Sequence, residues 1–580
     1  MRRGLRALAY SSNSSRLGRH SAGIVRADGS VEEVEKSEFY DEKLEEGRRS
    51  SVRAKSFSLP DLNPGDIVDF QYRIDLNEYY YSPELFLTFQ ERWPLRGAKV
   101  RVRPASWVDG FGFIKWMTSK CDAKGMVKKG DDFYELEVGN FPADNSEPYQ
   151  PPEKTNIAWL MFYMSPNGRT GDSYWKMEGA NLYKKMNSTT KAGKGVKSVI
   201  KELLAGVSGE EEKLEAIYDY CVTELINSVY GKSGELSPEE RKEIKSDMNA
   251  EKVLAQGYGN PRNINTVFCA LARAAGFDAR NTALNSRTGY RFSKVLASLS
   301  TTMKRRCVAI PNGDSWRYFD PGGKYLAFGH LDWEAQGVVA LVSDKKNVLI
   351  QSTPFSKSND TVEKSKAKLT LDEKGSLSGH VEFELTGHTG INMKRVMDGM
   401  SPQKRKTFFK NAMNDEWSDA VIDSIEISNV TSSFKPIRIA FELKSFPYAE
   451  IIGDRILLQV NPFRKFSEPD FPETERTSDI FFDYASSEIE EVEIALTDGF
   501  ELEEASAPRP FKVDGVVEYA AKLGIKKKSN TLVYSKTFSM NGTNFPVKHY
   551  KTIKSLYDKK HKQDQHTITL KRKATDVSSL

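Results

Sequence analysis

The stretch that most restricts the fold is residues 257–277, which read GYGNPRNINTVFCALARAAGF. Its apolar residues recur at the three-and-four spacing of one helix face, and they are Ile264, Val267, Phe268, Leu271 and Ala275. Asn260 offers a side-chain oxygen suited to a helix N-cap, and Pro261 suits the first helical position because its missing N–H is not needed there. Gly276 closes the run. The pattern therefore predicts a helix that packs one face against a core.

The first residue of this helix decides what chemistry the N-terminus can support. Unpaired N–H groups and the positive end of the helix dipole stabilise a thiolate, so a cysteine placed there would have a lowered pKa. Pro261 has no nucleophilic atom. By local rules alone, the segment is a well-formed helix start that needs no function to explain it.

The first part of the chain has the pattern of short β-strands. Asp28-Gly29 is a tight-turn signal, and Pro64-Gly65 precedes a run in which apolar and polar residues alternate. The alternating apolar residues are Val68, Phe70, Tyr72 and Ile74. Many short strands with regular turns predict an antiparallel β-sandwich over residues 1–168.

Residues 169–351 change to helices followed by strands. The predicted helix starts are Ser208 with Glu211, Ser237-Pro238 with Glu240, and Ala250, the last helix ending at Gly257. Short strands are expected at 307–310 and 317–319. Helices and strands that are segregated rather than alternating predict an α+β domain.

A polar segment at 352–361 separates this region from a second β region, residues 362–580. Apolar alternation on both sides of Gly375 predicts a hairpin, and Ser401-Pro402 begins one inserted helix that includes Phe408 and Met413. The expected fold here is a mostly-β sandwich. A chain of 580 residues is too long for one core, so the protein is expected to be multidomain.

The overall charge is close to balance. Eighty-five basic and 80 acidic residues leave a net charge of +5, part of it gathered at Lys526 to Lys528 and in a tail from Lys548 to Lys573. A basic tail is typical of a solvated surface, and its alternative is contact with an anionic polymer or a membrane surface. The whole-chain charge does not support that alternative, so no nucleic-acid partner is predicted.

Membrane and export signals are weak in the sequence. The longest apolar run, Ile157 to Met164, is far shorter than the roughly twenty residues that span a bilayer, so no transmembrane segment is predicted. The N-terminal residues are basic at first but lack the apolar stretch of a secretory signal. Either the protein is cytoplasmic or the sequence begins inside a longer precursor.

The four cysteines show no metal-binding spacing. Cys121, Cys221, Cys269 and Cys307 form no C-x-x-C pair and have no histidines at metal-site intervals. Neither structural zinc, another metal, a cofactor nor a disulfide framework is therefore predicted. Cys221 lies on the apolar stripe of a helix, where a thiol behaves as a small hydrophobe.

Three segments together resemble known families. Residues 257–277, above all ALARAAGF at 270–277, resemble the core helix of the transglutaminase-like superfamily, which has a papain-like fold. Residues 316–329, WRYFDPGGKYLAFG, are similar to the strand that carries the family's catalytic aspartate. Residues 51–73 resemble a bacterial N-terminal β domain of unknown function that commonly precedes such a core, and the region after Leu369 resembles the domain that follows it.

The resemblance implies that two of three catalytic positions are replaced. The family's cysteine position falls on Pro261 and its histidine position near Arg305, whereas Asp320 keeps the aspartate. No histidine occurs between His20 and His330. The family is typically exported. The resemblance thus implies a catalytically inactive binding or scaffolding protein of the bacterial cell envelope, with a peptide, protein or glycan as partner.

Two other functions stay open. A displaced thiol, Cys307 or Cys269, could serve an active cysteine amidase, peptidase or acyl transferase, with His330 and Asp320 as base and orienting group. Cys307 follows Lys304, Arg305 and Arg306, charges that could favour a thiolate. The third function is a β-sandwich that binds polysaccharide through exposed aromatic residues, for which the run Tyr79, Tyr80 and Tyr81 is one source.

A ligand groove is predicted at the start of the 261–274 helix. Its expected lining is Tyr258, Arg262, Asn263 and Tyr325. The alternative is that both tyrosines simply pack into the core. Because no histidine is near, the carboxylate of Asp320 is expected to be structural and to pair with Arg305, Arg306 or backbone donors.

Overall fold

The computed structural model describes residues 4–573, except 12–14, 47–50, 60, 77–83, 92, 104–111, 122–126, 129–132, 167–168, 231–235, 297, 466 and 498. The tyrosine run 79–81 lies outside the described residues. The chain divides into two compact units, Met1–Leu85 and Phe86–Leu580. Across the described ranges, no helix has the length and apolar character needed to cross a bilayer.

The first unit consists of antiparallel strands in two three-stranded sheets, ordered β1-β5-β4 and β3-β2-β6. Gly29 adopts a φ of +86° in the turn between β2 and β3, which glycine tolerates best. Ala22, Ile24, Phe57 and Leu59 form a buried cluster. The predicted β character of this region is confirmed. Its strands are β1 (Gly4–Ser11), β2 (Ser15–Val25), β3 (Val31–Glu33), β4 (Phe39–Glu46), β5 (Ser51–Leu59) and β6 (Ile67–Leu76).

The second unit begins with two more three-stranded sheets, ordered β7-β12-β9 and β10-β11-β8. The long apolar run noted in the sequence forms the central strand β12, whose residues Trp159 to Tyr163 are buried. The elements are β7 (Glu84–Thr88), β8 (Leu95–Val102), β9 (Gly112–Ser119), β10 (Val127–Lys128), β11 (Tyr134–Phe141), α1 (Glu153–Asn156) and β12 (Trp159–Pro166).

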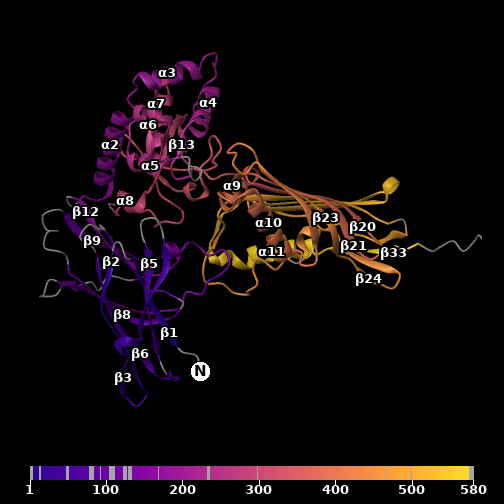
Figure 1. The fold of residues 1–580 in the computed structure, drawn as a ribbon, viewed down its shortest axis with the longest axis horizontal. Helices are drawn as coiled ribbons and strands as arrows, with labels where there is room; N and C mark the ends of the chain where they lie inside the picture. Colours follow the sequence, from indigo (N-terminus) through magenta and orange to yellow (C-terminus); the bar gives the residue numbers. More distant parts are fainter. Residues whose placement is uncertain are drawn as a thin grey trace, which may run out of the picture. The chain divides into compact units, whose positions relative to one another are not determined.

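A group of helices follows, and Figure 1 shows α3, α4, α6 and α7 gathered together. They are α2 (Gly171–Thr189), α3 (Lys194–Leu203), α4 (Glu210–Thr223), α5 (Pro238–Glu243), α6 (Ala250–Gln256) and α7 (Pro261–Ala274). The ten residues of α7 from Asn263 to Ala272 are all buried. Apolar side chains of the neighbouring helices surround this helix in one core, so the predicted core-facing helix is confirmed.

The predicted helix ends are mostly confirmed. Ser237 and Glu240 form the reciprocal capping box of α5, and α6 ends at Gly257 with a φ of +75°. The capping box expected from Ser208 is wrong, because α4 is capped by Gly209 without a side-chain bond. Glu211 instead extends away to pair with Arg317.

The helices pack against an antiparallel five-stranded sheet, ordered β17-β16-β15-β18-β19. Its strands are β15 (Arg280–Leu284), β16 (Arg305–Asn312), β17 (Ser315–Phe319), β18 (Val339–Val342) and β19 (Leu349–Ser352). Phe268 of α7 contacts Phe319 at the end of β17, with ring centroids 5.3 Å apart. Smaller elements are β13 (Ile226–Asn227), which pairs with β14 (Tyr258–Gly259), and α8 (Leu299–Thr302). The expected α+β arrangement is confirmed.

The C-terminal region is dominated by an eight-stranded sheet, ordered β22-β23-β21-β20-β27-β31-β30-β29. Its strands are β20 (Val362–Leu371), β21 (Ser376–Leu385), β22 (Val421–Ser428), β23 (Ile437–Pro447), β27 (Ser486–Ala495), β29 (Phe511–Val513), β30 (Val517–Lys526) and β31 (Thr531–Met540). A four-stranded sheet, β24-β25-β33-β28, and a two-stranded pair, β26 with β32, complete the region. These are β24 (Glu450–Ile452), β25 (Arg455–Gln459), β26 (Ile480–Phe481), β28 (Phe500–Glu504), β32 (Asn544–Phe545) and β33 (Thr567–Arg572).

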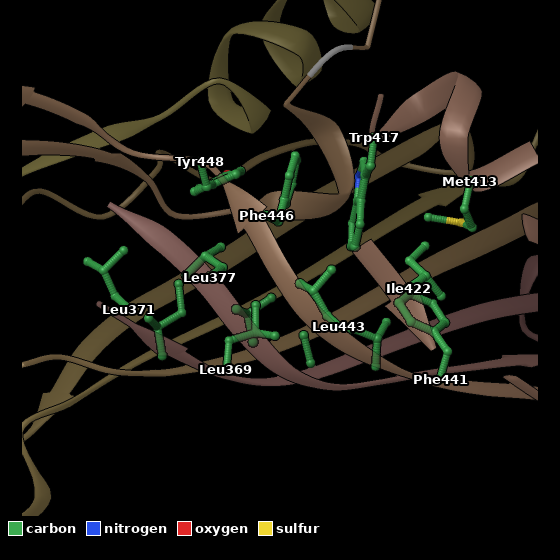
Figure 2. Close-up of a cluster of buried hydrophobic side chains, with 14 of the residues drawn as sticks. Leu369, Leu371, Leu377, Met413, Trp417, Ile422, Phe441, Leu443, Phe446 and Tyr448 are labelled. Carbon is green, nitrogen blue, oxygen red and sulfur yellow. The ribbon is translucent and has the colours of Figure 1, made fainter. Parts of the chain in front are cut away.

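One face of the large sheet carries a buried apolar cluster (Figure 2). The predicted inserted helix is present as α10 (Pro402–Glu416), with Ser401 as its N-cap. Met413 and the following Trp417 lie over the strands, and Trp417 stacks on Phe446 of β23 with ring centroids 5.1 Å apart.

The expectation of a single helix in this region is wrong. The structure adds α9 (Gly387–Met397) and α11 (Tyr550–Asp564). The second of these lies in the basic tail that the sequence suggested was a solvated surface. Its many lysines make the sequence look polar throughout, but the helix also has a buried apolar face. The residues of this face are Tyr550, Ile553, Leu556 and Tyr557.

A buried ionic cluster joins α11 to the large sheet. The Lys536 side chain on β31 is fully buried, and its Nζ lies 3.1 Å from Glu488, 3.2 Å from Glu490 and 3.0 Å from Asp564 at the end of α11. Arg464 also pairs with Glu488 at 2.9 Å and with Glu490 at 2.8 Å. Burial raises the pKa of Glu490, but the charges of Lys536 and Arg464 outweigh it and leave that pKa below its usual value.

Candidate ligand-binding site

A cavity of about 540 Å³ opens at the N-terminus of α7. The helix begins there because the Asn260 side chain accepts a hydrogen bond from the Asn263 N–H at 3.0 Å and Pro261 occupies the first turn. Gly322 lies against this start, since a Cβ at that position would be 2.2 Å from the Pro261 carbonyl oxygen. The lining residues are Tyr230, Ser246, Asn260, Pro261, Arg262, Asn265, Lys304, Arg305, Arg306, Asp320, Gly322, Gly323, Lys324, Leu326, Asp332 and Arg395.

Asp320, just after β17, is held by Asn265 of α7. The Asn265 Nδ2 donates to Asp320 Oδ1 at 2.8 Å and to the Arg306 carbonyl at 3.1 Å, while its Oδ1 accepts the Gly322 N–H at 2.9 Å. The expected pairing of the Asp320 carboxylate with Arg305, Arg306 or backbone donors is wrong, because the donor found among the described residues is the Asn265 side chain. Arg305 bonds to Glu334 at 2.6 Å instead.

The environment of Asp320 disfavours its charge. Burial raises the pKa of Asp320 to about 6, although the hydrogen bond from Asn265 and the charge of Arg305 lower it. Asn265 is the residue that the sequence interpretation missed. The only local signal was an amide one turn after Pro261 in a helix predicted to pack against the core, and such a residue is buried only when it is hydrogen-bonded.

The cavity is strongly cationic. Its described lining contains six basic side chains, Arg262, Lys304, Arg305, Arg306, Lys324 and Arg395, against two acidic ones, Asp320 and Asp332. Three of the bases are paired: Arg305 with Glu334, Arg395 with Asp332 and Lys324 with Asp398. Among the described residues, no carboxylate forms an ion pair with the other three.

Arg306 is the most constrained of the unpaired cations. Its Nη1 donates to the Arg305 carbonyl at 2.8 Å and to the Met303 carbonyl. Burial, together with the positive charge of Arg262, lowers the pKa of Arg306 to about 10. A half-buried guanidinium that is satisfied only by backbone carbonyls has donors left for an anion.

The structure brings only some of the predicted groove residues together. Arg262 lines the cavity, but Asn263 is fully buried and donates to the Lys245 carbonyl at 3.1 Å. Tyr258 is also buried in the β13–β14 pair. Tyr325 lines two neighbouring pockets rather than this one, and its hydroxyl donates to Asp398 at 3.0 Å.

The candidate displaced thiols are in unreactive surroundings. Burial raises the pKa of Cys269 to about 12. Burial also raises the pKa of Cys307 well above its usual value, the Asp320 carboxylate raises it further, and Arg306 lowers it by less. The expectation that neighbouring cations favour a Cys307 thiolate is therefore wrong. His330 lines a different pocket.

We expect Cys121 alone among the four cysteines to react with an alkylating reagent in the folded protein, because the other three are buried. Intact-mass measurement after iodoacetamide treatment near neutral pH should show one adduct. That adduct should be absent from Cys121→Ser, and denaturation should expose the remaining thiols. Fast labelling of native Cys269 or Cys307 would contradict the expectation and would support the hypothesis of an enzyme with a displaced thiol.

The described part of the chain contains no candidate metal site. No cluster of three or more histidine, cysteine, aspartate or glutamate side chains there has the arrangement to hold an ion. The cavity at α7 offers anion-binding groups instead.

Three family models match the chain. The Transglutaminase-like superfamily model matches residues 197–321, which include α7, β16 and Asp320. Two Domains of Unknown Function, DUF3857 and DUF3858, match residues 2–106 and 454–570. No curated protein matches the sequence.

One solved structure is similar in fold over nearly the whole chain. A crystal structure of a candidate protease from Parabacteroides distasonis has a TM-score of 0.52 and 14% identity, and the match covers 98% of this chain and 92% of that one. A candidate cysteine protease from Cytophaga hutchinsonii matches 60% of this chain and 89% of its own, with a TM-score of 0.20 and 10% identity. The chain thus carries a transglutaminase-like superfamily domain between a DUF3857 and a DUF3858 domain.

Proposed function

We propose that this protein binds an extended anionic ligand at the cavity beside the α7 N-terminus and performs no thiol chemistry on it. One observation carries the proposal. The described residues lining this cavity include six cationic side chains and neither a cysteine nor a histidine. Both the charge and the missing reactive groups favour binding over catalysis.

Nucleophilic catalysis by a cysteine needs a thiolate and a base within hydrogen-bond reach. Pro261 occupies the helix start where the resemblance locates the nucleophile, and Arg305, near the position of the base, is paired with Glu334. The Asp320 carboxylate accepts a hydrogen bond from Asn265 and therefore has a structural role. We infer that the catalytic pair is lost and the binding cleft retained.

The unpaired cations suit a carboxylate or another acidic group. Arginine presents several N–H donors in a planar fork that matches the oxygens of an anion. Arg262 lies in the first turn of α7, where free N–H groups and the helix dipole add attraction, although Pro261 supplies no N–H. We propose an acidic peptide or glycan as the ligand.

The resemblance to exported proteins leads us to propose the bacterial cell envelope as the place of this binding. Fractionation of the native host, with antibodies against this chain, tests it directly. Recovery of the protein only in the cytosolic fraction would refute the location and leave the binding proposal standing.

Arg306→Gln is expected to weaken binding of an acidic probe at least about tenfold, because a hydrogen bond to a charged group contributes about 1.5–3 kcal/mol. Suitable probes are a hexaglutamate peptide and a uronic-acid oligosaccharide, titrated by calorimetry at low salt. Arg262→Gln combined with Lys304→Gln should have a similar effect.

The matched control is Lys345→Gln with Lys346→Gln, which removes two charges from exposed positions between β18 and β19 of the same domain. This variant should bind as the parent does. Hexaglutamine and a neutral oligosaccharide should not bind. Equal losses in the control and the cavity variants would show that only net charge matters and would refute a specific site.

A further inference from the structure

A second cavity of about 610 Å³ lies elsewhere in the second unit, and the proposed function does not use it. Its walls come from three separate parts of the chain: the segment before α1, the loops around Thr288 and Trp333, and the C-terminal region. The lining contains seven aromatic side chains, Tyr149, Trp333, Phe481, Phe482, Tyr484, Phe538 and Tyr557. Such a concentration of rings around a cavity is typical of a ligand site.

The rings are held in place by one another. Phe482 lies 5.0 Å from Tyr149 and 5.9 Å from Tyr557, centroid to centroid, and the Phe482 and Tyr557 rings are stacked. Trp333 contacts Phe481 edge-on at 6.4 Å. The Tyr149 backbone has a φ of +55°, which is uncommon for a bulky residue, and its hydroxyl donates to Asp470 at 2.8 Å. The aromatic wall is therefore preformed.

The same cavity is acidic. Four carboxylates, Glu147, Asp470, Asp483 and Glu488, line it together with one ammonium, Lys560. The positive charge of Lys560 is already balanced by Glu488, because the Lys560 Nζ lies 3.4 Å from that carboxylate. The cavity lining thus has four acidic side chains against one basic side chain, and Arg287 lies beside Asp483 outside this lining.

Two of these carboxylates are fully engaged within the protein. Glu147 accepts hydrogen bonds from the Thr477 and Ser478 N–H groups at 2.8 and 2.9 Å. Glu488 belongs to the buried ionic cluster around Lys536. Their charge is already compensated, so they shape the wall rather than bind a ligand.

The other two carboxylates have free oxygens. Asp470 accepts from the Tyr149 hydroxyl through Oδ1, and its Oδ2 has no hydrogen-bond partner among the described residues. Asp483 is exposed, and neither of its carboxylate oxygens accepts a bond from the described part of the chain. An aromatic wall with two available carboxylates complements a cation on an apolar stem.

The protein already places cations over some of these rings. The Arg287 guanidinium carbon lies 4.2 Å from the Phe481 ring centroid, and Lys560 Nζ lies 5.0 Å from that of Phe538. Both distances fall within the usual range of a cation–π contact. Two of the cavity's rings, Phe481 and Phe538, thus already contact cations of the protein itself.

From the charge complementarity and the aromatic wall, we propose that this cavity binds the ammonium or guanidinium group of a lysine or arginine side chain in a polypeptide. The apolar stem would lie along Tyr149 and Phe482, and the charged group would reach Asp470 and Asp483. A neutral sugar would use the rings but would leave the free carboxylate oxygens of Asp470 and Asp483 without a cation. The cavity is thus distinct in ligand class from the cationic site at α7.

The test is a calorimetric titration of the full chain with two acetylated and amidated tripeptides, Gly-Lys-Gly and Gly-Arg-Gly. The same peptide with norleucine keeps the apolar stem without the charge and should bind at least tenfold more weakly. Asp470→Asn combined with Asp483→Asn should weaken binding of the lysine peptide at least tenfold. Tyr149→Ala should also weaken it, whereas Tyr149→Phe, which keeps the ring, should retain most of the affinity.

The matched control is Asp454→Asn with Asp514→Asn, which removes two exposed carboxylates from the same C-terminal region. It should bind as the parent does, and the melting temperature of every variant shows whether it is folded. Equal affinity for the lysine and norleucine peptides, or no binding of either, would overturn the proposal. Binding of a neutral N-acetylglucosamine oligosaccharide instead would make the cavity a glycan site and would also overturn it. Arg306→Gln should leave this binding unchanged, so the result is independent of the site at α7.

Discussion

Replacing Lys536 with methionine is expected to lower the free energy of unfolding by about 3–5 kcal/mol. Lys536 is buried among Glu488, Glu490 and Asp564, and its removal would leave their negative charges without the central cation. A buried charge that loses its partner has a large desolvation cost that nothing offsets. Urea unfolding near neutral pH, followed by circular dichroism, measures the change.

Lys526→Met is the matched control, because Lys526 on the adjacent strand β30 pairs with Glu493 at 2.8 Å while both side chains are about half exposed. Exposed pairs contribute at most about 1 kcal/mol, so this variant should be nearly as stable as the parent. The Lys536→Met loss should shrink in acid, where the carboxylates bind protons. A Lys536→Met protein as stable as the control would mean that the cluster tolerates an apolar centre.

Replacing Asp320 with asparagine is expected to raise the free energy of unfolding at pH 8 by about 3 kcal/mol. The pKa of Asp320 in the folded protein is about 6, whereas an ordinary aspartate side chain has a pKa of 3.8, and each pKa unit corresponds to about 1.4 kcal/mol. Below about pH 4 both states hold the proton. Between about pH 4 and 6, Asp320 loses its proton in the unfolded chain but still holds it in the folded protein. The native state therefore loses stability as the pH rises through this range. Asparagine can keep the bond from Asn265 without this loss.

The gain should therefore be present at pH 8 and absent at pH 4, as measured by chemical unfolding at both values. Asp314→Asn is the control, since Asp314 is an exposed carboxylate in the turn that leads into the same strand. It should change stability by less than about 0.5 kcal/mol at either pH. Destabilisation by Asp320→Asn at pH 8 would show that attraction to Arg305 outweighs burial, as the sequence interpretation assumed.

The sequence by itself determined the elements whose signals are local. The N-cap at Asn260, the proline at the first turn of α7, the capping box at Ser237 and the left-handed Gly257 all appear as predicted. Each depends on residues within about one helical turn of one another. The succession of β, α+β and β regions followed from periodicity in the same way.

The tertiary structure decided the properties of the site. The cations of the cavity come from α7, the start of β16, the loop after β17 and α9, segments that no local pattern connects. Burial, and not the neighbouring charges, sets the pKa of Cys307, and Asn265 rather than an arginine holds Asp320. Helix α11 was not predicted from the sequence, because lysines dominate the composition of this segment, whereas the apolar face that holds the helix in place is buried. Caps and periodicity act between near neighbours in the chain, whereas desolvation and charge pairing depend on which distant residues the fold brings together.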